Sequence, residues 1–123
     1  MRFAQDTVSG ANIVRAYTEG ELTINQEVVR SSVVVMPERL IRDWAPESVD
    51  DLEEDHVAEL AALGVEIVLI GTGRHQRFPP LRLIAPLTAQ GIGVEVMDTA
   101  AACRTYNILL SEDRSVAAAL FMI

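Results

Sequence analysis

The first third of the chain alternates short apolar runs with polar turns, a pattern typical of β-strands. The β-rich runs are Ile13 to Tyr17, Leu22 to Ile24 and Val33 to Met36. The second run alternates with polar residues, which favours a strand with one face in water, whereas the third is apolar throughout and favours a buried strand. We therefore expect an antiparallel β-meander in this part of the chain.

The connection from Trp44 to Asp55 contains Pro46 and a cluster of acids. These acids are Glu47, Asp50, Asp51, Glu53, Glu54 and Asp55. Acids ahead of a helix stabilise its N-terminus, so a solvated surface connection explains the cluster, and binding of a cation or a basic partner is the alternative.

In the middle of the chain, helical and strand patterns alternate. Helical spacing predicts an amphipathic helix from Glu54 to Leu63 that ends at Gly64. Two apolar strands are predicted at residues 65–70 and 92–97, and a helix is predicted between them at residues 79–90. This order predicts a right-handed βαβ unit with parallel strands. Because Pro86 lies in the connecting segment, that helix is expected to be short, kinked or late in starting.

The last third predicts one well-defined helix and a final apolar run. Asp98 is a suitable N-cap for a helix from Thr99 to Leu110, in which apolar side chains share one face. The run from Val116 to Ile123 is interpreted as a buried strand, with a terminal helix as the alternative because three alanines favour it.

Length and charge narrow the class of protein. The 123 residues suit one domain, which we expect to span residues 1–123, and no apolar stretch reaches the roughly 20 residues of a membrane span. The N-terminus has no secretory pattern, so the expected location is cytoplasmic. A net charge of −8 argues against nucleic acid as a partner. With a single cysteine, multi-thiolate metal sites are excluded, and we expect no metal and no cofactor.

The carboxyl ends of the two predicted parallel strands form the leading candidate site, because ligands favour this edge of open α/β sheets. The candidate residues are Gly71, Thr72, Gly73, Arg74, His75, Arg77, Asp98, Thr99, Arg104 and Asn107. The loop after the glycine turn is locally basic and suits a small anion or an acidic peptide. Gly-Thr-Gly lacks the third glycine of a dinucleotide fingerprint and the ending of a P-loop, so a tight turn is the simpler interpretation.

Several of these residues have structural explanations as well. Asp98 is better explained as a helix cap than as an acid catalyst. Arg104 and Asn107 share a polar helix face, where a structural hydrogen-bond network explains them as readily as a ligand does. Cys103 with His75 would make a thiolate–imidazole pair, but this cysteine falls on the apolar helix face and behaves more simply as a small hydrophobe. No residue is assigned as catalytic, and Trp44 is a candidate anchor for a partner or a loop.

Four segments together resemble a known family. They are Ile70 to Gly73, Gly91 to Thr99, Ala101 to Asn107 and Glu112 to Leu120. The chain is similar, over nearly its whole length, to the small domain-of-unknown-function family that includes the mitochondrial respiratory complex I assembly factor three. The resemblance implies a three-layer α/β fold with a mixed central sheet, one βαβ crossover, a last strand antiparallel to its neighbours and an N-terminal β layer.

Two functional hypotheses follow. The resemblance favours a non-enzymatic assembly or accessory factor that contacts other proteins, including membrane-complex subunits, through the sheet edge or the acidic Trp44 segment. The alternative is a protein that binds a small anionic ligand, or an enzyme, at the Gly71 turn. A closed crevice with an apolar patch elsewhere would favour the first, and a pocket lined by Arg74, Thr99, Arg104 and Asn107 the second. The chain is expected to be a monomer or a homodimer that covers an edge strand.

Overall fold

A mixed five-stranded sheet forms the centre of the computed structural model, which describes residues 10–123. Its strands are β4 (Val33–Met36), β5 (Arg39–Ile41), β6 (Ile67–Gly71), β7 (Gly93–Met97) and β8 (Val116–Leu120). They lie in the order β5-β4-β8-β6-β7. Strands β8, β6 and β7 are parallel, while β4 is antiparallel to both β5 and β8. The predicted parallel pairing of the strands on either side of residues 79–90 is confirmed.

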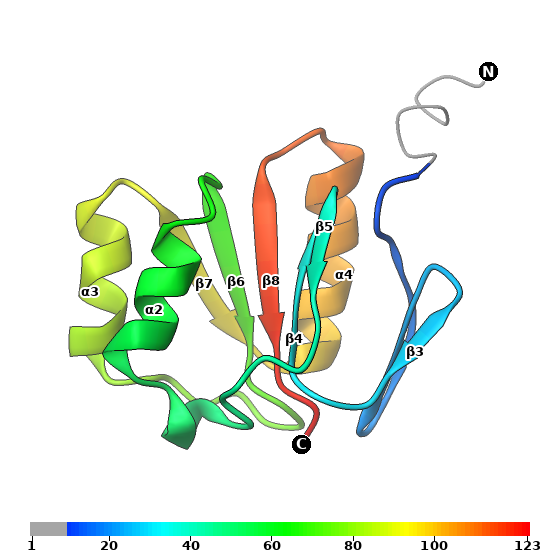
Figure 1. The fold of residues 1–123 in the computed structure, drawn as a ribbon, viewed down its shortest axis with the longest axis horizontal. Coiled ribbons are helices and arrows are strands. Elements are labelled where there is room, and N and C mark those ends of the chain that lie inside the picture. The colour runs from blue at the N-terminus through cyan, green and yellow to red at the C-terminus, as the bar shows by residue number, and fades with distance from the viewer. Residues whose placement is uncertain (1–9) are drawn as a thin grey trace.

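Different layers cover the two faces of this sheet (Figure 1). Helices α2 (Glu54–Ala61) and α3 (Leu81–Ala89) lie on one side, preceded by the short 3-10 helix η1 (Val49–Asp51). On the other side lie helix α4 (Thr99–Ser111) and a small antiparallel sheet of β1 (Val14–Thr18), β2 (Glu21–Ile24) and β3 (Glu27–Val29). The expected three-layer α/β fold with an N-terminal β layer is therefore confirmed.

Strand alternation divides the core into two clusters. In β8, Ala117 and Ala119 face the cluster that contains Leu60 of α2 and Leu83 of α3. The intervening side chains face the cluster beneath α4 and the small sheet. All five residues of β8 are buried, which is why this strand is apolar throughout rather than alternating. The interpretation of the final run as a buried strand is thus confirmed for Val116–Leu120, while residues 121–123 lie beyond the strand.

The direction of the last strand is only partly as expected. β8 runs antiparallel to β4 but parallel to β6. The reason is a second crossover, because α4 carries the chain from β7 back past β6 to β8. Right-handed crossovers that progress in opposite directions along a sheet place their helices on opposite faces, which accounts for α3 and α4 lying on different sides.

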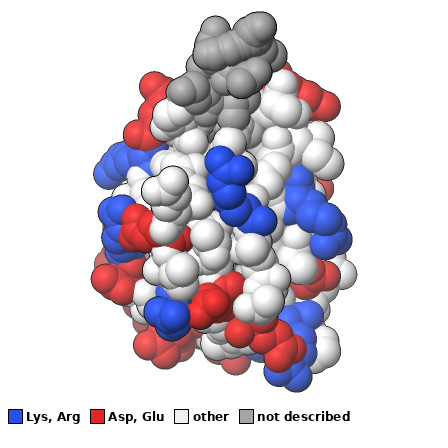
Figure 2. Space-filling model, turned by 90° about the vertical axis from the view of Figure 1, so that its right-hand side faces the viewer, with Lys and Arg blue, Asp and Glu red and all other residues white. Residues whose placement is uncertain are grey.

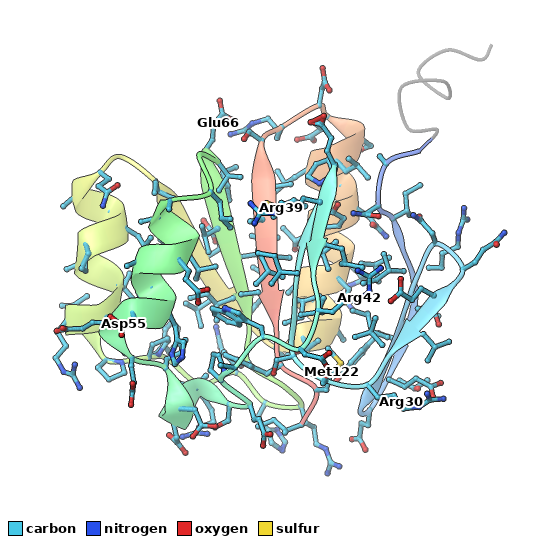
Figure 3. All side chains as sticks on the ribbon, in the orientation of Figure 1. Arg30, Arg39, Arg42, Asp55, Glu66 and Met122 are labelled. Atoms are coloured by element: carbon cyan, nitrogen blue, oxygen red, sulfur yellow. The ribbon has the colours of Figure 1, made fainter. Side chains whose placement is uncertain are left out.

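The predicted meander also needs correction. Val33–Met36 pairs with β8 in the central sheet, and the third strand of the small sheet is instead Glu27–Val29. An ion pair joins the two sheets, since Arg42, just after β5, donates to Glu27 of β3 at 2.6 Å. Figure 3 shows Arg42 in the space between the central sheet and β3.

Local signals in the helices behave as expected. Helix α2 is followed by Gly64 in the left-handed conformation, at φ +76°. Helix α3 has nine residues and contains Pro86 on its exposed side, so it is short, as one of the predicted alternatives requires.

Candidate functional site

The carboxyl ends of β6, β7 and β8 meet at one edge, where α4 begins close against β6. A Cβ added at Gly71 would lie 2.9 Å from the Leu120 side chain and 3.0 Å from the Cα of Thr99. Only glycine therefore lets the start of α4 approach the end of β6 this closely. The sequence-predicted candidates Gly71 and Thr99 are brought together, and their contact is a packing contact.

Thr99 ties three segments together at this edge. Its hydroxyl accepts a hydrogen bond from the Gly73 amide at 2.7 Å and donates one to the Phe121 carbonyl at 2.8 Å. Its own amide donates to the Gly73 carbonyl at 2.9 Å. Thr99 is fully buried, so these bonds satisfy polar groups that no water reaches.

Thr72 organises the loop that follows. Its amide donates to the Met97 carbonyl, and its hydroxyl donates to the His75 carbonyl at 2.5 Å while accepting from the Arg77 amide at 3.1 Å. The amide of Arg74 donates to the Ile123 carbonyl at 2.7 Å. The polar groups of the turn are therefore used by the protein's own backbone.

The basic side chains of the loop already have acidic partners. Arg74 binds Glu19 with a contact of 2.8 Å, and Arg77 binds Asp50 at 2.6 Å. All four side chains are exposed, and pairs of this kind contribute only about 0–1 kcal/mol each. The positive charge of the loop is therefore balanced locally, which favours a structural role for the turn.

The two candidates farther along α4 lie elsewhere. Arg104 and Asn107 line a shallow groove of about 260 Å³ between α4 and β1 that the Gly71 turn does not enter. Asn107 accepts from the Val14 amide at 3.1 Å and donates to the Val14 carbonyl at 2.7 Å. It therefore satisfies the free edge of β1 as a neighbouring strand would. Asp98 caps α4, as predicted, by accepting from the Ala101 amide at 2.8 Å.

Cys103 and His75 do not form a catalytic pair among residues 10–123. Cys103 is buried on the inner face of α4, whereas His75 is exposed in the loop after the turn, and no hydrogen bond between them occurs in this range. Burial raises the pKa of the Cys103 thiol to about 12, with a smaller opposing effect from Arg104. The thiol is therefore protonated at neutral pH and is a poor nucleophile.

Trp44 belongs to the core. Only 6% of its surface is exposed, its ring stacks on Phe121 with a centroid separation of 6.0 Å, and its indole nitrogen donates to Glu59 at 3.1 Å. The ring packs mainly within the core, so this tryptophan anchors the acidic connection to the sheet.

Open apolar surface lies instead at the α2 and α3 layer. A groove of about 490 Å³ separates these two helices. Its lining residues are Glu54, Val57, Ala58, Ala61, Ala62, Arg82, Leu83, Pro86 and Gln90. Close to the start of α3, Phe78 and Leu81 are 71% and 78% exposed. Sequence reasoning missed this groove, although the closely spaced alanines of α2 were a weak signal of it.

The face of the molecule around the small sheet carries a mixture of charged side chains. Figure 2 shows acidic and basic side chains interspersed there with uncharged surface, so neither sign of charge dominates this side of the molecule. In the part of the chain that the structure describes, no three potential ligands cluster as a metal site, and no helix is long and apolar enough to cross a membrane.

Residues 14–121 match the family described as "Protein of unknown function (DUF498/DUF598)". A Francisella tularensis protein named "13 kDa major membrane protein" is 27% identical, with 94% of this chain and 95% of that protein covered. NADH dehydrogenase (ubiquinone) 1 alpha subcomplex assembly factor 3 of Xenopus tropicalis is 34% identical, over 87% of this chain but 59% of that protein. A crystal structure from Bordetella parapertussis has 37% identity and a TM-score of 0.86, covering 93% of this chain and 98% of that one.

Proposed function

Because this chain belongs to the family described as "Protein of unknown function (DUF498/DUF598)", as its sequence resemblance indicated, we propose that it acts as an accessory or assembly factor that binds other proteins. The observation that carries the proposal is the similarity, at about 30% identity, to proteins named as NADH dehydrogenase assembly factors in several animals. The aligned region covers 94% of this chain.

The geometry agrees with this role better than with ligand binding or catalysis. At the strand ends, the polar groups of Thr72 and Thr99 bond to backbone within the fold. The only cysteine is buried and protonated. Large apolar side chains are exposed elsewhere, at Phe78 and Leu81. Exposed apolar surface of this kind marks contacts with other macromolecules.

Subunits of a membrane-bound enzyme complex are the proposed partners. The chain spans about three fifths of the length of the frog assembly factor, so that protein's partners enter here as a proposal. A cytoplasmic site of action is likewise proposed, and the relative named as a major membrane protein makes the membrane surface the place to look for partners. Cell fractionation with a tagged chain tests the location, because an integral membrane pool would contradict it.

The function is tested by deleting the gene in its native cells and comparing membrane complexes on native gels. We expect one assembled complex to fall in amount while the mRNA levels of its subunits stay unchanged, with restoration by the wild-type chain. Affinity capture of the tagged chain should recover subunits of the same complex. Normal complexes in the deletion strain, together with an empty wild-type capture, would contradict the proposal.

A further inference from the structure

The groove between α2 and α3 has a shape suited to binding a third helix. The two helices lie side by side and lead into the parallel strands β6 and β7, so they run in the same direction (Figure 1). Buried Val57 and Leu83 form the floor, and exposed Ala58, Ala62 and Pro86 form the sides. Small side chains along a helix leave room for another helix to approach closely.

The dimensions of the groove fit a short helical segment. Helices α2 and α3 have eight and nine residues, which corresponds to a length of about 12–14 Å at 1.5 Å per residue. A partner helix lying along it would contact the groove through two to three turns, the spacing at which residues i, i+3, i+4 and i+7 fall on one face. Phe78, just before α3, and Leu81, its first residue, are large exposed apolar side chains.

The charged side chains of α2 indicate which kind of helix the groove would bind. Helix α2 and its N-cap carry four exposed carboxylates, at Glu53, Glu54, Asp55 and Glu59. Of these carboxylates Glu54 lines the groove, together with the basic residue Arg82, so the acidic excess comes from the neighbouring exposed positions of α2. Within residues 10–123, neither Glu54 nor Asp55 takes part in an ion pair. Figure 3 shows Asp55 near the beginning of α2, on the side of the molecule remote from the small sheet.

We propose that the α2–α3 groove binds an amphipathic helix of a partner protein, with its apolar face against Ala58, Ala62 and Pro86 and with Lys or Arg beside the carboxylates of α2. This inference rests on the proposed function and names the kind of segment that the accessory factor recognises. A second copy of the chain is disfavoured as the occupant, because groove-to-groove contact would place the two acidic helices together in a protein of net charge −8.

A matched pair of alanines tests the proposal in the full-length chain. Ala58 lines the groove and Ala89 lies on the exposed side of α3 outside it, and both are exposed helical positions. A photoreactive p-benzoylphenylalanine is placed at one position or the other, the tagged proteins are irradiated in native cells, and the cross-linked peptides are sequenced by mass spectrometry. Capture is also compared between wild type, Ala58→Arg and Ala89→Arg.

We expect position 58, and not position 89, to cross-link to a partner segment with apolar residues at helical spacing and Lys or Arg between them. Ala58→Arg should lower recovery of that partner by about tenfold or more, the effect of an interfacial contact worth 1.4 kcal/mol, while Ala89→Arg leaves it unchanged. The paired change Glu54→Gln with Asp55→Asn should weaken capture several-fold at low salt and much less at high salt.

Three results would overturn the groove assignment while leaving the accessory role intact. They are recovery by Ala58→Arg equal to wild type, equal cross-linking from positions 58 and 89, and a cross-linked peptide that is acidic or comes from a second copy of this chain. Failure of the wild-type chain to recover any partner, with normal complexes in the deletion strain, is the separate result that removes the proposed function and this inference with it.

Discussion

The strand-end edge and the α2–α3 layer use their side chains in opposite ways. At the strand ends, Thr72 and Thr99 use their hydroxyls on the protein's own backbone, and the arginines of the loop are paired with nearby acids. Across the sheet, α2 and α3 leave a groove of about 490 Å³, and large apolar side chains near the start of α3 are exposed. At the Gly71 turn, on the edge where α/β proteins commonly bind ligands, the polar groups serve folding, whereas the outer helical layer offers an open apolar groove.

The difference has a simple physical origin. Two crossovers and the returning β8 bring three strand ends and the start of α4 to one edge, where buried backbone groups must find partners. Helices α2 and α3 each bury one apolar face on the sheet, and this requirement places no constraint on their outer sides. Substitutions at the edge should therefore affect folding, and substitutions on the outer side of the helical layer should affect binding.

The largest expected effect concerns the chemical inertness of Cys103. A rise of its pKa from an ordinary 9.0 to about 12 lowers the thiolate population on the order of a thousandfold at any pH below 9. We expect iodoacetamide to label native protein at least about a hundredfold more slowly than unfolded protein, with a rate that still rises between pH 9 and pH 10. Rapid labelling of the native protein at pH 8 would show that this side of the sheet is open after all.

Gly73→Ala should cause the largest loss of stability. Gly73 has φ +100°, and an added Cβ would lie 2.6 Å from the Ile123 carbonyl oxygen, so backbone strain and a backbone clash combine to cost about 3 kcal/mol. Chemical denaturation measures the loss. Gly91→Ala is the matched control, because its φ is +81° with nothing within 4 Å, and strain alone should cost about 1 kcal/mol. Equal losses in the two variants would contradict the tight packing described at the strand ends.

Thr99→Val should have a somewhat smaller effect at the same edge. The substitution keeps the shape of the side chain but leaves the Gly73 amide and the Phe121 carbonyl buried without partners, at a cost of about 2 kcal/mol in the free energy of unfolding. Thr88→Val, at an exposed position of α3, is the control and should change stability by less than about 0.5 kcal/mol. A negligible loss from Thr99→Val would mean that water reaches this edge and that the site is open to ligands.

Local chemistry made much of the fold predictable. The Asp98 cap, the left-handed Gly64 and the spacing of apolar residues located two helices closely, and alternation located most strands. The pairing of strands that are distant in the sequence was harder to predict, because a short apolar run such as Val33–Met36 suits either sheet. The edge strand Arg39–Ile41 was missed because it is short and begins with a charged residue.

The candidate site was less predictable than the fold for the same reason. The glycine turn and the start of α4 were correctly expected at one edge, but closure depends on bonds such as that between Gly73 and Thr99, which are 26 residues apart. The groove is built from two helices, and its alanines are only a weak signal in the sequence. Whether polar residues bind each other or a ligand is decided by non-local geometry, which periodicity does not encode.

The smallest expected effect on stability comes from the helical layer, where Phe78→Ser and Leu81→Ser remove exposed apolar side chains. Because these side chains are 71% and 78% exposed, little burial is lost, and the free energy of unfolding should change by less than about 0.5 kcal/mol per substitution. The same changes should reduce partner recovery by several-fold, since apolar side chains exposed in the free protein contribute when a partner covers them. Thr88→Ser, also on α3, is the control for both measurements. A stability loss as large as that of Thr99→Val would mean that this layer, too, is committed to folding, and the distinction between the two regions would fail.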